Sequence, residues 1–377
     1  MSRSLLVVAG EASGDLHAGA VLQAIRQRDP SLAVFGIGGD RMAGAGAELL
    51  VHAREMAVFG PIAALAKYPF FRRVFSSLLR EVDARRPVAA LLVDYGGFNL
   101  RLAARLQKRG IRVLYYISPQ VWASRPRRIR TLARVADLLM VIFPFEKEVY
   151  AGSNLDVEFV GHPLVDEIGA FQTTPGAELP WRGSLPIALL PGSRRQEVDA
   201  ILPVMLEAAG RIAHLRPDAG FIVAAPSEEI ARMAETRLAA MPGPFPQVSV
   251  VIDQTRAVLR DARAAMVASG TATIEAALLG CPMVVIYRIS PLLYFIAKRL
   301  VRVPFIGMVN LVAGESICPE RIQGAATGPS IAQAMLPLLE DTPERKAQCD
   351  GMARVAQRLG EPGAVDRVCA LVLERIA

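Results

Sequence analysis

The chain has 377 residues, of which 52% are hydrophobic and 21% charged, and this composition excludes a disordered chain. Its length exceeds one typical hydrophobic core, so we expect two domains. No apolar run approaches the roughly 20 residues that span a bilayer, and the apolar segment at residues 5–9 is too short for a signal peptide, so we expect a cytoplasmic protein.

The net charge of +7 is unevenly distributed. No acidic residue lies between Asp94 and Asp137, whereas that stretch holds ten Lys or Arg. Such a stretch indicates an anionic partner, phosphate or acidic lipid, although a solvated basic face is an equal reading. No nucleic-acid-binding motif accompanies it, so nucleic acid is not an expected partner. The four cysteines and four histidines lack metal-ligand or CxxC spacing, so we predict neither a metal site nor disulfides.

Short apolar segments alternate with helical patterns through the first half. Strands are predicted at residues 5–9, 34–37, 89–94, 113–117 and 138–142, and helices at 15–28, 71–86 and 100–109. This alternation predicts a doubly wound, Rossmann-like α/β domain over residues 1–170. Residues 171–176 are polar and turn-rich, which predicts a linker.

The alternation then restarts, with strands predicted at residues 187–190, 221–225, 248–252, 264–268 and 283–287. We therefore predict a second Rossmann-like domain over residues 185–342. A helical tail, residues 343–377, could pack on the first domain or on a partner subunit, which leaves a homodimer open. Tandem domains of this kind place a cleft between the carboxyl ends of two sheets, where ligands bind.

The loop after the first strand carries three polar candidates, Glu11, Ser13 and Asp15. Its glycines let a ligand approach the backbone, and the following helix offers its positive end. Two acids would repel a pyrophosphate, so a dinucleotide site is not expected. The remaining readings are contact with the hydroxyls of a sugar and capping of the helix by Ser13 and Asp15.

Two further strand-end loops of the first domain carry candidates. Asp94 ends a predicted strand just before two glycines, where its carboxylate could take a proton from an attacking hydroxyl. Capping of the next helix is the alternative. The loop after the following strand brings Trp122 beside four arginines, which suits a sugar face and a phosphate, although a packed Trp on a basic helix would look the same.

In the second domain, residues 190–194 end a strand and open a helix. Ser193 can cap that helix, and Arg194 can bind a phosphate through two parallel hydrogen bonds. A helix N-terminus, a glycine and an arginine together predict an anion site.

The strongest element is the loop and first helical turn at residues 269–275. Its small residues let backbone N–H groups approach a diphosphate, while Glu275, about one turn into the helix, would repel phosphate but suits the two hydroxyls of a ribose. A helix merely capped by Ser or Thr is the alternative. The candidate residues for a nucleotide diphosphate are Ser193, Arg194, Ser269, Gly270, Thr271, Ala272, Thr273 and Glu275, with Asn310 and Gln323 from irregular sequence past the sheet as readers of a base or sugar.

Taken together and in order, the motifs resemble those of the lipid A disaccharide synthases, glycosyltransferases of the GT-B architecture. The matching residues are 10–15, Asp94 with Phe98 and Asn99, Ser118 with Pro119, Val121 and Trp122, residues 143–147, 161–163, 190–194, 269–275 and 281–285, residues 310–314, and Pro319 with Glu320. Each motif is weak alone, but the ordered set spans most of the chain.

The resemblance implies an inverting transfer of 2,3-diacylglucosamine from UDP-2,3-diacylglucosamine to the 6-hydroxyl of 2,3-diacylglucosamine 1-phosphate. UDP and a β-1′,6-linked disaccharide 1-phosphate are the products. Asp94 is the best candidate for the single base, with Glu11 and Asp15 as alternatives. Acceptor-binding candidates are Glu11, Ser13, Asp15, Asn99 and Trp122. No DxD-type carboxylate pair is present, so we expect neither a metal nor another cofactor.

The chain departs from the family pattern at several positions. Gly97 stands where the family usually has a second Asp, which argues that the base is not at that position. Ser124 replaces a tryptophan, and Glu315 with Ser316 replaces an Arg-Glu pair, so no role is predicted for these residues.

Both implied substrates carry acyl chains, so the resemblance implies docking at the inner membrane of a Gram-negative bacterium. Residues 58–77 are the first candidate, because apolar, aromatic and cationic side chains mix there. The predicted docking residues are Ile62, Leu65, Lys67, Tyr68, Phe70, Phe71, Arg72 and Arg73, and packing in the domain core is the alternative. Residues 292–301, with Lys298, Arg299 and Arg302, are a second, weaker candidate.

Two rival functions remain open at this point. An epimerase acting on a UDP-sugar would use the same fold and nucleotide loop without the docking segment. A non-catalytic peripheral membrane protein that senses a UDP-sugar would not depend on Asp94.

Overall fold

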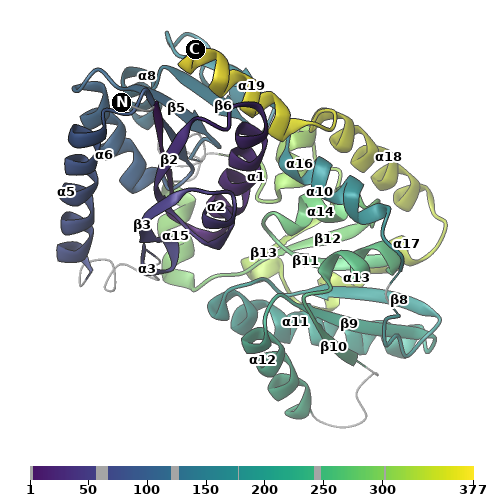
Figure 1. Cartoon of the computed structure of the whole chain (residues 1–377). Helices are drawn as coiled ribbons and strands as arrows, with labels where there is room; N and C mark the ends of the chain where they lie inside the picture. The colour runs from purple at the N-terminus through teal and green to yellow at the C-terminus, as the bar shows by residue number, and fades with distance from the viewer. Residues whose placement is uncertain (1–2, 57–66, 120–126, 177, 242–247, 301–302) are drawn as a thin grey trace. The chain divides into compact units, whose positions relative to one another are not determined.

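The computed structural model describes residues 3–56, 67–119, 127–176, 178–241, 248–300 and 303–377. The chain forms two compact units, one of residues 1–163 with 361–377 and one of residues 164–360. Each contains a parallel sheet with helices on its faces, which confirms the predicted α/β class of two Rossmann-like units (Figure 1).

Seven parallel strands form the sheet of the first unit, in the order β3-β2-β1-β4-β5-β6-β7. The strands are β1 (Ser4–Ala9), β2 (Ala33–Gly38), β3 (Glu48–His52), β4 (Ala89–Val93), β5 (Arg112–Tyr116), β6 (Leu138–Val141) and β7 (Asp156–Phe159). The central strands are buried on both faces, as near-continuous apolar runs require. The order reverses between β1 and β4, and the carboxyl ends of neighbouring strands at such a point are where ligands bind these sheets.

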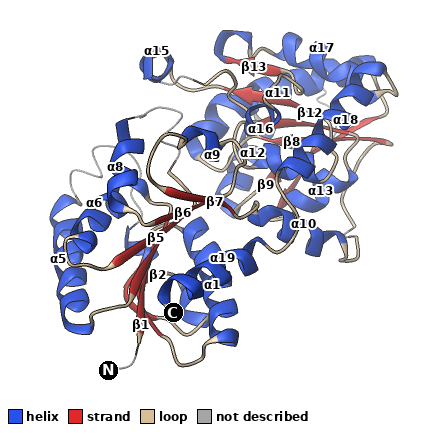
Figure 2. Cartoon of the chain, turned by 90° about the horizontal axis from the view of Figure 1, so that it is seen from above, coloured by secondary structure: helices blue, strands red, loops and turns tan. Residues whose placement is uncertain are grey.

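Helices cover both faces of this sheet: α1 and α19 lie on one face, and α5 and α6 on the other (Figures 1 and 2). The helices of the unit are α1 (Ala12–Arg28), α2 (Asp40–Gly44), α3 (Ala53–Met56), α5 (Tyr68–Arg85), α6 (Gly96–Gln107), α8 (Arg127–Val135), α9 (Glu146–Val149) and α19 (Ala364–Ile376). Arg28 Nη2 is 2.7 Å from Asp366 Oδ1, and Arg3 Nη2 donates to Ile376 O at 2.6 Å. These contacts attach the last helix, α19, to the first unit.

The second unit has six parallel strands in the order β10-β9-β8-β11-β12-β13. They are β8 (Leu185–Leu190), β9 (Ala219–Ala225), β10 (Val248–Ile252), β11 (Ala264–Ala268), β12 (Met283–Tyr287) and β13 (Glu320–Ile322). Here β8 lies between β9 and β11, so the order again reverses at the first strand of the unit. This places the loops that follow β8 and β11 at the same edge of the sheet.

The helices of the second unit are α10 (Pro163–Gln172), α11 (Arg195–Leu215), α12 (Glu228–Ala239), α13 (Thr255–Asp261), α14 (Ala272–Leu278), α15 (Pro291–Leu300), α16 (Met308–Ala313), α17 (Gly328–Leu339) and α18 (Pro343–Arg358). Buried side chains of α11, α12 and α17 share one core with the strands. The predicted helical tail is thus divided, with α18 in this unit and α19 in the other.

All ten predicted strands are present, but three strands lack a clear apolar run and were missed. These are β3, β7 and β13, which carry no fully buried residue. The prediction of irregular sequence at Asn310 and Gln323 is wrong, because α16 contains the first and a short 3-10 helix, Gln323–Ala325, begins at the second. The predicted linker overlaps the end of α10, and the two units divide between Pro163 and Leu164.

Candidate functional site

Asp94 lies in a sharp turn between β4 and α6, at the reversal point of the first sheet. Asp94 and Tyr95 both have left-handed backbone conformations, with φ of 46° and 49°, which only a well-supported turn maintains in non-glycine residues. The turn is tightly packed: a Cβ on Gly10 would lie 2.5 Å from Tyr95 Cδ1, and one on Gly96 would lie 2.7 Å from Pro119 Cβ. Small residues at these two positions are therefore required to seat Asp94.

The Asp94 carboxyl group is poised to exchange a proton near neutral pH. Burial, with the negative charge of Glu11 as a second cause, raises its pKa from 3.8 to about 6. The Glu11 side chain is exposed and has no hydrogen bond among the residues the structure describes. A carboxylate with a pKa near 6 is ionised at neutral pH yet basic enough to accept a proton from a hydroxyl, as a general base must.

Two of the predicted acceptor-binding residues are engaged inside the first unit. The Asp15 carboxylate accepts from the backbone N–H groups of Gly39, Arg41 and Met42 at 2.6–3.1 Å, so it caps α2 rather than its own helix. Neither it nor Ser13 caps α1, whose N-cap is Glu11. The Asn99 side chain is fully buried and donates to the carbonyls of Val8, Val93 and Asp94. Asp15 and Asn99 therefore organise the strand ends, and Ser13 and Glu11 remain exposed.

The other predicted residues of the first unit differ in their surroundings. Trp122 and Ser124, like Ile62 and Leu65, lie outside the described residues. Phe70 and Phe71 pack partly against the core of the first unit, which supports the alternative reading of these two predicted docking residues. The side chains of Lys67, Tyr68, Arg72 and Arg73 are exposed. Gly97 is exposed, and a Cβ there would meet nothing within 4 Å. An Asp side chain would therefore fit at this position without a clash.

In the second unit, the two predicted nucleotide loops meet because β8 and β11 are paired, with Leu190 opposite Val267. In the loop after β11, Gly270 has a φ of 148° and a Cβ there would meet nothing within 4 Å, so the backbone is open to a ligand. Ser269 Oγ and Thr273 Oγ1 donate to the carbonyls of Ile306 and Gly270, respectively. Their hydroxyl protons therefore fix the loop instead of facing a diphosphate. Thr271 is exposed and is the hydroxyl best placed to meet a ligand.

Glu275 lies on the first turn of α14 as predicted, but its partner could not be read from the sequence. Arg256 Nε donates to Glu275 Oε1 at 3.1 Å, and Arg256 Nη2 binds Glu167 Oε2 at 2.5 Å. Burial raises the pKa of Glu275, and Arg256 partly counteracts that effect. The arginine thus holds a partly buried carboxylate in place at the edge of the nucleotide loop.

In the loop after β8, the carboxylate of Glu197 occupies the predicted phosphate site. The Glu197 carboxylate accepts from the backbone N–H groups of Ser193 and Arg194 at 3.3 and 3.4 Å, and Arg194 Nη1 lies 2.9 Å from its Oε1. A phosphate that used these same donors would have to displace Glu197. The signal for this residue was a glutamate three positions after the helix N-cap, the pattern of a capping box.

The structure does not support direct nucleotide contacts by Asn310 or Gln323. Asn310 is fully buried, and its amide is saturated by the backbone of Ile317 and Cys318 and by Glu320. The Gln323 amide bridges the N–H and carbonyl of Ile289. Both side chains are therefore occupied in shaping the region beyond β12, and their role as readers of a base stays a prediction.

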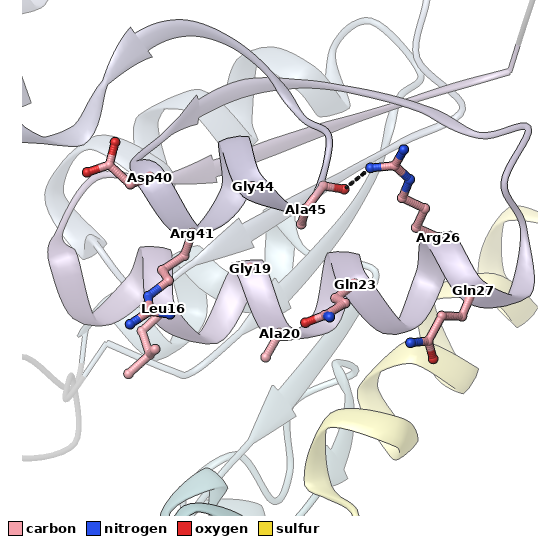
Figure 3. A pocket seen from close by; sticks show the side chains of 10 residues that line it. All are labelled: Leu16, Gly19, Ala20, Gln23, Arg26, Gln27, Asp40, Arg41, Gly44 and Ala45. Carbon is pink, nitrogen blue, oxygen red and sulfur yellow. Dashed lines mark hydrogen bonds between the residues drawn. The ribbon is translucent and has the colours of Figure 1, made fainter.

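A groove of about 600 Å³ follows α1 and α2 on the first unit (Figure 3). Arg26 and Arg41 lie toward opposite ends of it, so the two guanidinium groups do not converge on one anion. Arg26 Nη1 donates to Ala45 O at 3.4 Å. None of the predicted site residues lines this groove.

Comparisons with known proteins agree with the order of the motifs. The sequence model of the family described as lipid-A-disaccharide synthetase matches residues 5–370. The lipid-A-disaccharide synthase of Syntrophotalea carbinolica is 41% identical over 377 residues, which cover 99% of this chain and 95% of the relative.

Solved structures with a similar fold are much less similar in sequence. The UDP-GlcNAc 2-epimerase from Neisseria meningitidis has a TM-score of 0.65 at 12% identity, covering 98% of this chain and 100% of that chain. The glycotransferase of kitacinnamycin has a TM-score of 0.65 at 18% identity, covering 100% of both chains. Since the two neighbours are an epimerase and a glycosyltransferase, the fold alone does not separate these activities.

Proposed function

The chain belongs to the lipid-A-disaccharide synthetase family and is a glycosyltransferase of the GT-B architecture, and from this premise we propose how its residues carry out the transfer. The reaction moves 2,3-diacylglucosamine from UDP-2,3-diacylglucosamine to the 6-hydroxyl of 2,3-diacylglucosamine 1-phosphate. The observation that carries the proposal is the environment of Asp94. Its carboxyl group is partly buried, has a pKa near 6 and lies at the reversal point of the first sheet.

In this proposal Asp94 removes the proton of the acceptor 6-hydroxyl as its oxygen attacks the anomeric carbon of the donor. The attack occurs on the face opposite the UDP group, so the configuration inverts in one step. The departing diphosphate is held by the backbone N–H groups at residues 270–272, by the Thr271 hydroxyl and by Arg194. Arg194 becomes available once Glu197 has released it. Glu275 accepts from the ribose hydroxyls, and Arg256 keeps its carboxylate ionised and oriented.

We propose that these groups stabilise the leaving group without a metal ion, because preorganised N–H donors, a helix N-terminus and Arg194 supply positive potential where charge develops. Among the described residues, no three His, Cys, Asp or Glu side chains come together as metal ligands.

The function is tested by incubating the full chain with UDP-2,3-diacylglucosamine, with and without the acceptor 2,3-diacylglucosamine 1-phosphate. Mass spectrometry should detect the disaccharide 1-phosphate and an equal amount of UDP only when the acceptor is present. Conversion of the donor to an epimer without the acceptor would indicate the rival isomerase instead. Binding of the donor with no turnover in either mixture would indicate a sensor.

We also propose that the chain docks on a membrane surface, and that α15 is the principal docking element. Leu293 and Phe295 on this helix are 52% and 58% exposed, and Lys298 and Arg299 follow them. Apolar and cationic side chains on one short helix suit the interface of an anionic bilayer. Within the described residues, no helix has the length and apolar character needed to cross a membrane.

Replacing Leu293 and Phe295 together with Ser should lower the fraction of protein bound to vesicles of anionic phospholipid by about tenfold or more, because each fully buried apolar side chain contributes about 1.5–3 kcal/mol. Vesicle sedimentation measures this fraction. Leu215→Ser is the matched control, since Leu215 on α11 is also 58% exposed but has no place in the proposed docking helix. Equal loss of binding in the two variants would contradict docking by α15.

A further inference from the structure

The backbone of Asp94 is held by more hydrogen bonds than its turn alone provides. The Tyr115 hydroxyl donates to Asp94 O at 2.6 Å, and Asn99 Nδ2 donates to the same oxygen at 2.9 Å. The two donors come from different elements, β5 and α6, and occupy both lone pairs of one carbonyl. Asp94 N in turn donates to Tyr116 O at 3.0 Å.

These bonds act on a backbone that would otherwise relax. A left-handed conformation is unfavourable for a non-glycine residue, and both Asp94 and Tyr95 adopt it. Relaxation of the Asp94 backbone toward an ordinary conformation would rotate its carbonyl and swing its carboxylate away from the edge of the sheet. Tyr115 is fully buried, so its hydroxyl is a fixed donor.

We propose that Tyr115 is a positioning residue for the reaction, which sets the direction of the Asp94 carboxylate by anchoring the Asp94 carbonyl, with Asn99 as the second anchor. The inference rests on the proposed role of Asp94 as base. Tyr115 does not meet substrate in this account, because its hydroxyl is directed at the main chain inside the first unit. A carboxylate displaced by about 1 Å loses about 10²-fold in rate, so the anchor affects catalysis more than binding.

Tyr115→Phe is the cleanest test, because it removes one oxygen, whereas truncating Asn99 would release the Val8 and Val93 carbonyls as well. We expect kcat for disaccharide formation to fall about 10- to 100-fold, with the KM for the donor and the Kd for UDP within about twofold of wild type, since UDP is held by residues of the second unit. Steady-state kinetics and calorimetric titration with UDP measure these quantities.

Val113→Ala is the control for lost stability. Val113 is on the same strand and fully buried in the same core, but it forms no bond to the Asp94 carbonyl. It should lower Tm at least as much as Tyr115→Phe, yet keep kcat close to wild type when assayed well below its Tm. A fall in kcat that tracks Tm equally in both variants would overturn the positioning role.

The pair Asp94→Asn and Tyr115→Phe separates this inference from the proposed base. If Tyr115 acts through Asp94, Tyr115→Phe should cause no further loss of the residual rate in the Asp94→Asn background, since residues acting as a unit are not additive. An equal further loss there would overturn the inference while leaving Asp94 as base. Full activity of Asp94→Asn alone would instead overturn the base assignment.

Discussion

Replacing Asp94 with Asn should lower kcat for disaccharide formation by about 10²–10⁴-fold, the usual contribution of a general base, and leave the Kd for UDP unchanged. Asn keeps the size of the side chain and tolerates a left-handed backbone, so the turn with φ of 46° should persist. In the wild type, kcat/KM, which reports the pKa values of the free enzyme, should fall tenfold per pH unit below the Asp94 pKa of about 6. This acid limb should be absent from the residual rate of the variant.

Gly97→Asp is the matched control for this experiment, since it changes the same turn without touching the base. A Cβ at Gly97 meets nothing within 4 Å, so the variant should fold. We expect it to retain turnover, and an acid near a helix N-terminus is mildly stabilising. If Gly97→Asp restored the activity of Asp94→Asn, a carboxylate at position 97 could serve as base and the assignment to Asp94 would lose its uniqueness.

Asp94→Asn should also be more stable than the wild type at alkaline pH. The folded pKa of Asp94 is raised from 3.8 to about 6, so the stability that its protonated form contributes is present below pH 3.8 and lost as pH rises through 6. Keeping the carboxylate ionised above pH 7 then costs up to about 3 kcal/mol, which Asn avoids. Calorimetry should show a higher Tm for the first unit of Asp94→Asn at pH 8 and a smaller difference at pH 4. A lower Tm at pH 8 would contradict the proposed burial of charge.

Replacing Glu275 with Gln should weaken UDP binding by about 10- to 100-fold, because hydrogen bonds to a charged acceptor contribute about 1.5–3 kcal/mol. The sharper expectation concerns the ribose. Wild type should prefer UDP over 2′,3′-dideoxy-UDP by a similar factor, and Glu275→Gln should bind the two ligands with affinities much closer to each other. Calorimetric titration of both ligands into both proteins measures the four affinities, which together form a thermodynamic cycle.

Glu167→Gln is the control for this cycle, since Glu167 shares Arg256 with Glu275 but lies on α10, outside the nucleotide loop. It should change UDP affinity by no more than a few-fold and keep the preference for the ribose. Undiminished discrimination between the two ligands in Glu275→Gln would show that the ribose hydroxyls bind elsewhere.

Some signals for the fold are local in the sequence. The buried strands and the helices α1, α5 and α6 were predicted because their apolar periodicity lies within about 5–20 consecutive residues. The partly exposed strands β3, β7 and β13 were not predicted, because each carries an incomplete apolar run. The family was identified because the residues of each motif are contiguous and the motifs keep their order along the chain.

The sequence by itself thus determined the fold class, the order of elements and the motifs at strand ends. Only the tertiary structure decided which groups those motifs meet: Asp15 caps α2, Arg256 holds Glu275, Glu197 occupies the predicted phosphate site, and Tyr115 anchors Asp94. Most of these contacts join residues about 20 or more positions apart or depend on the left-handed turn at Asp94. Periodicity carries no information about such pairings, because they depend on the strand order, which brings β1 beside β2 and β4 beside β5.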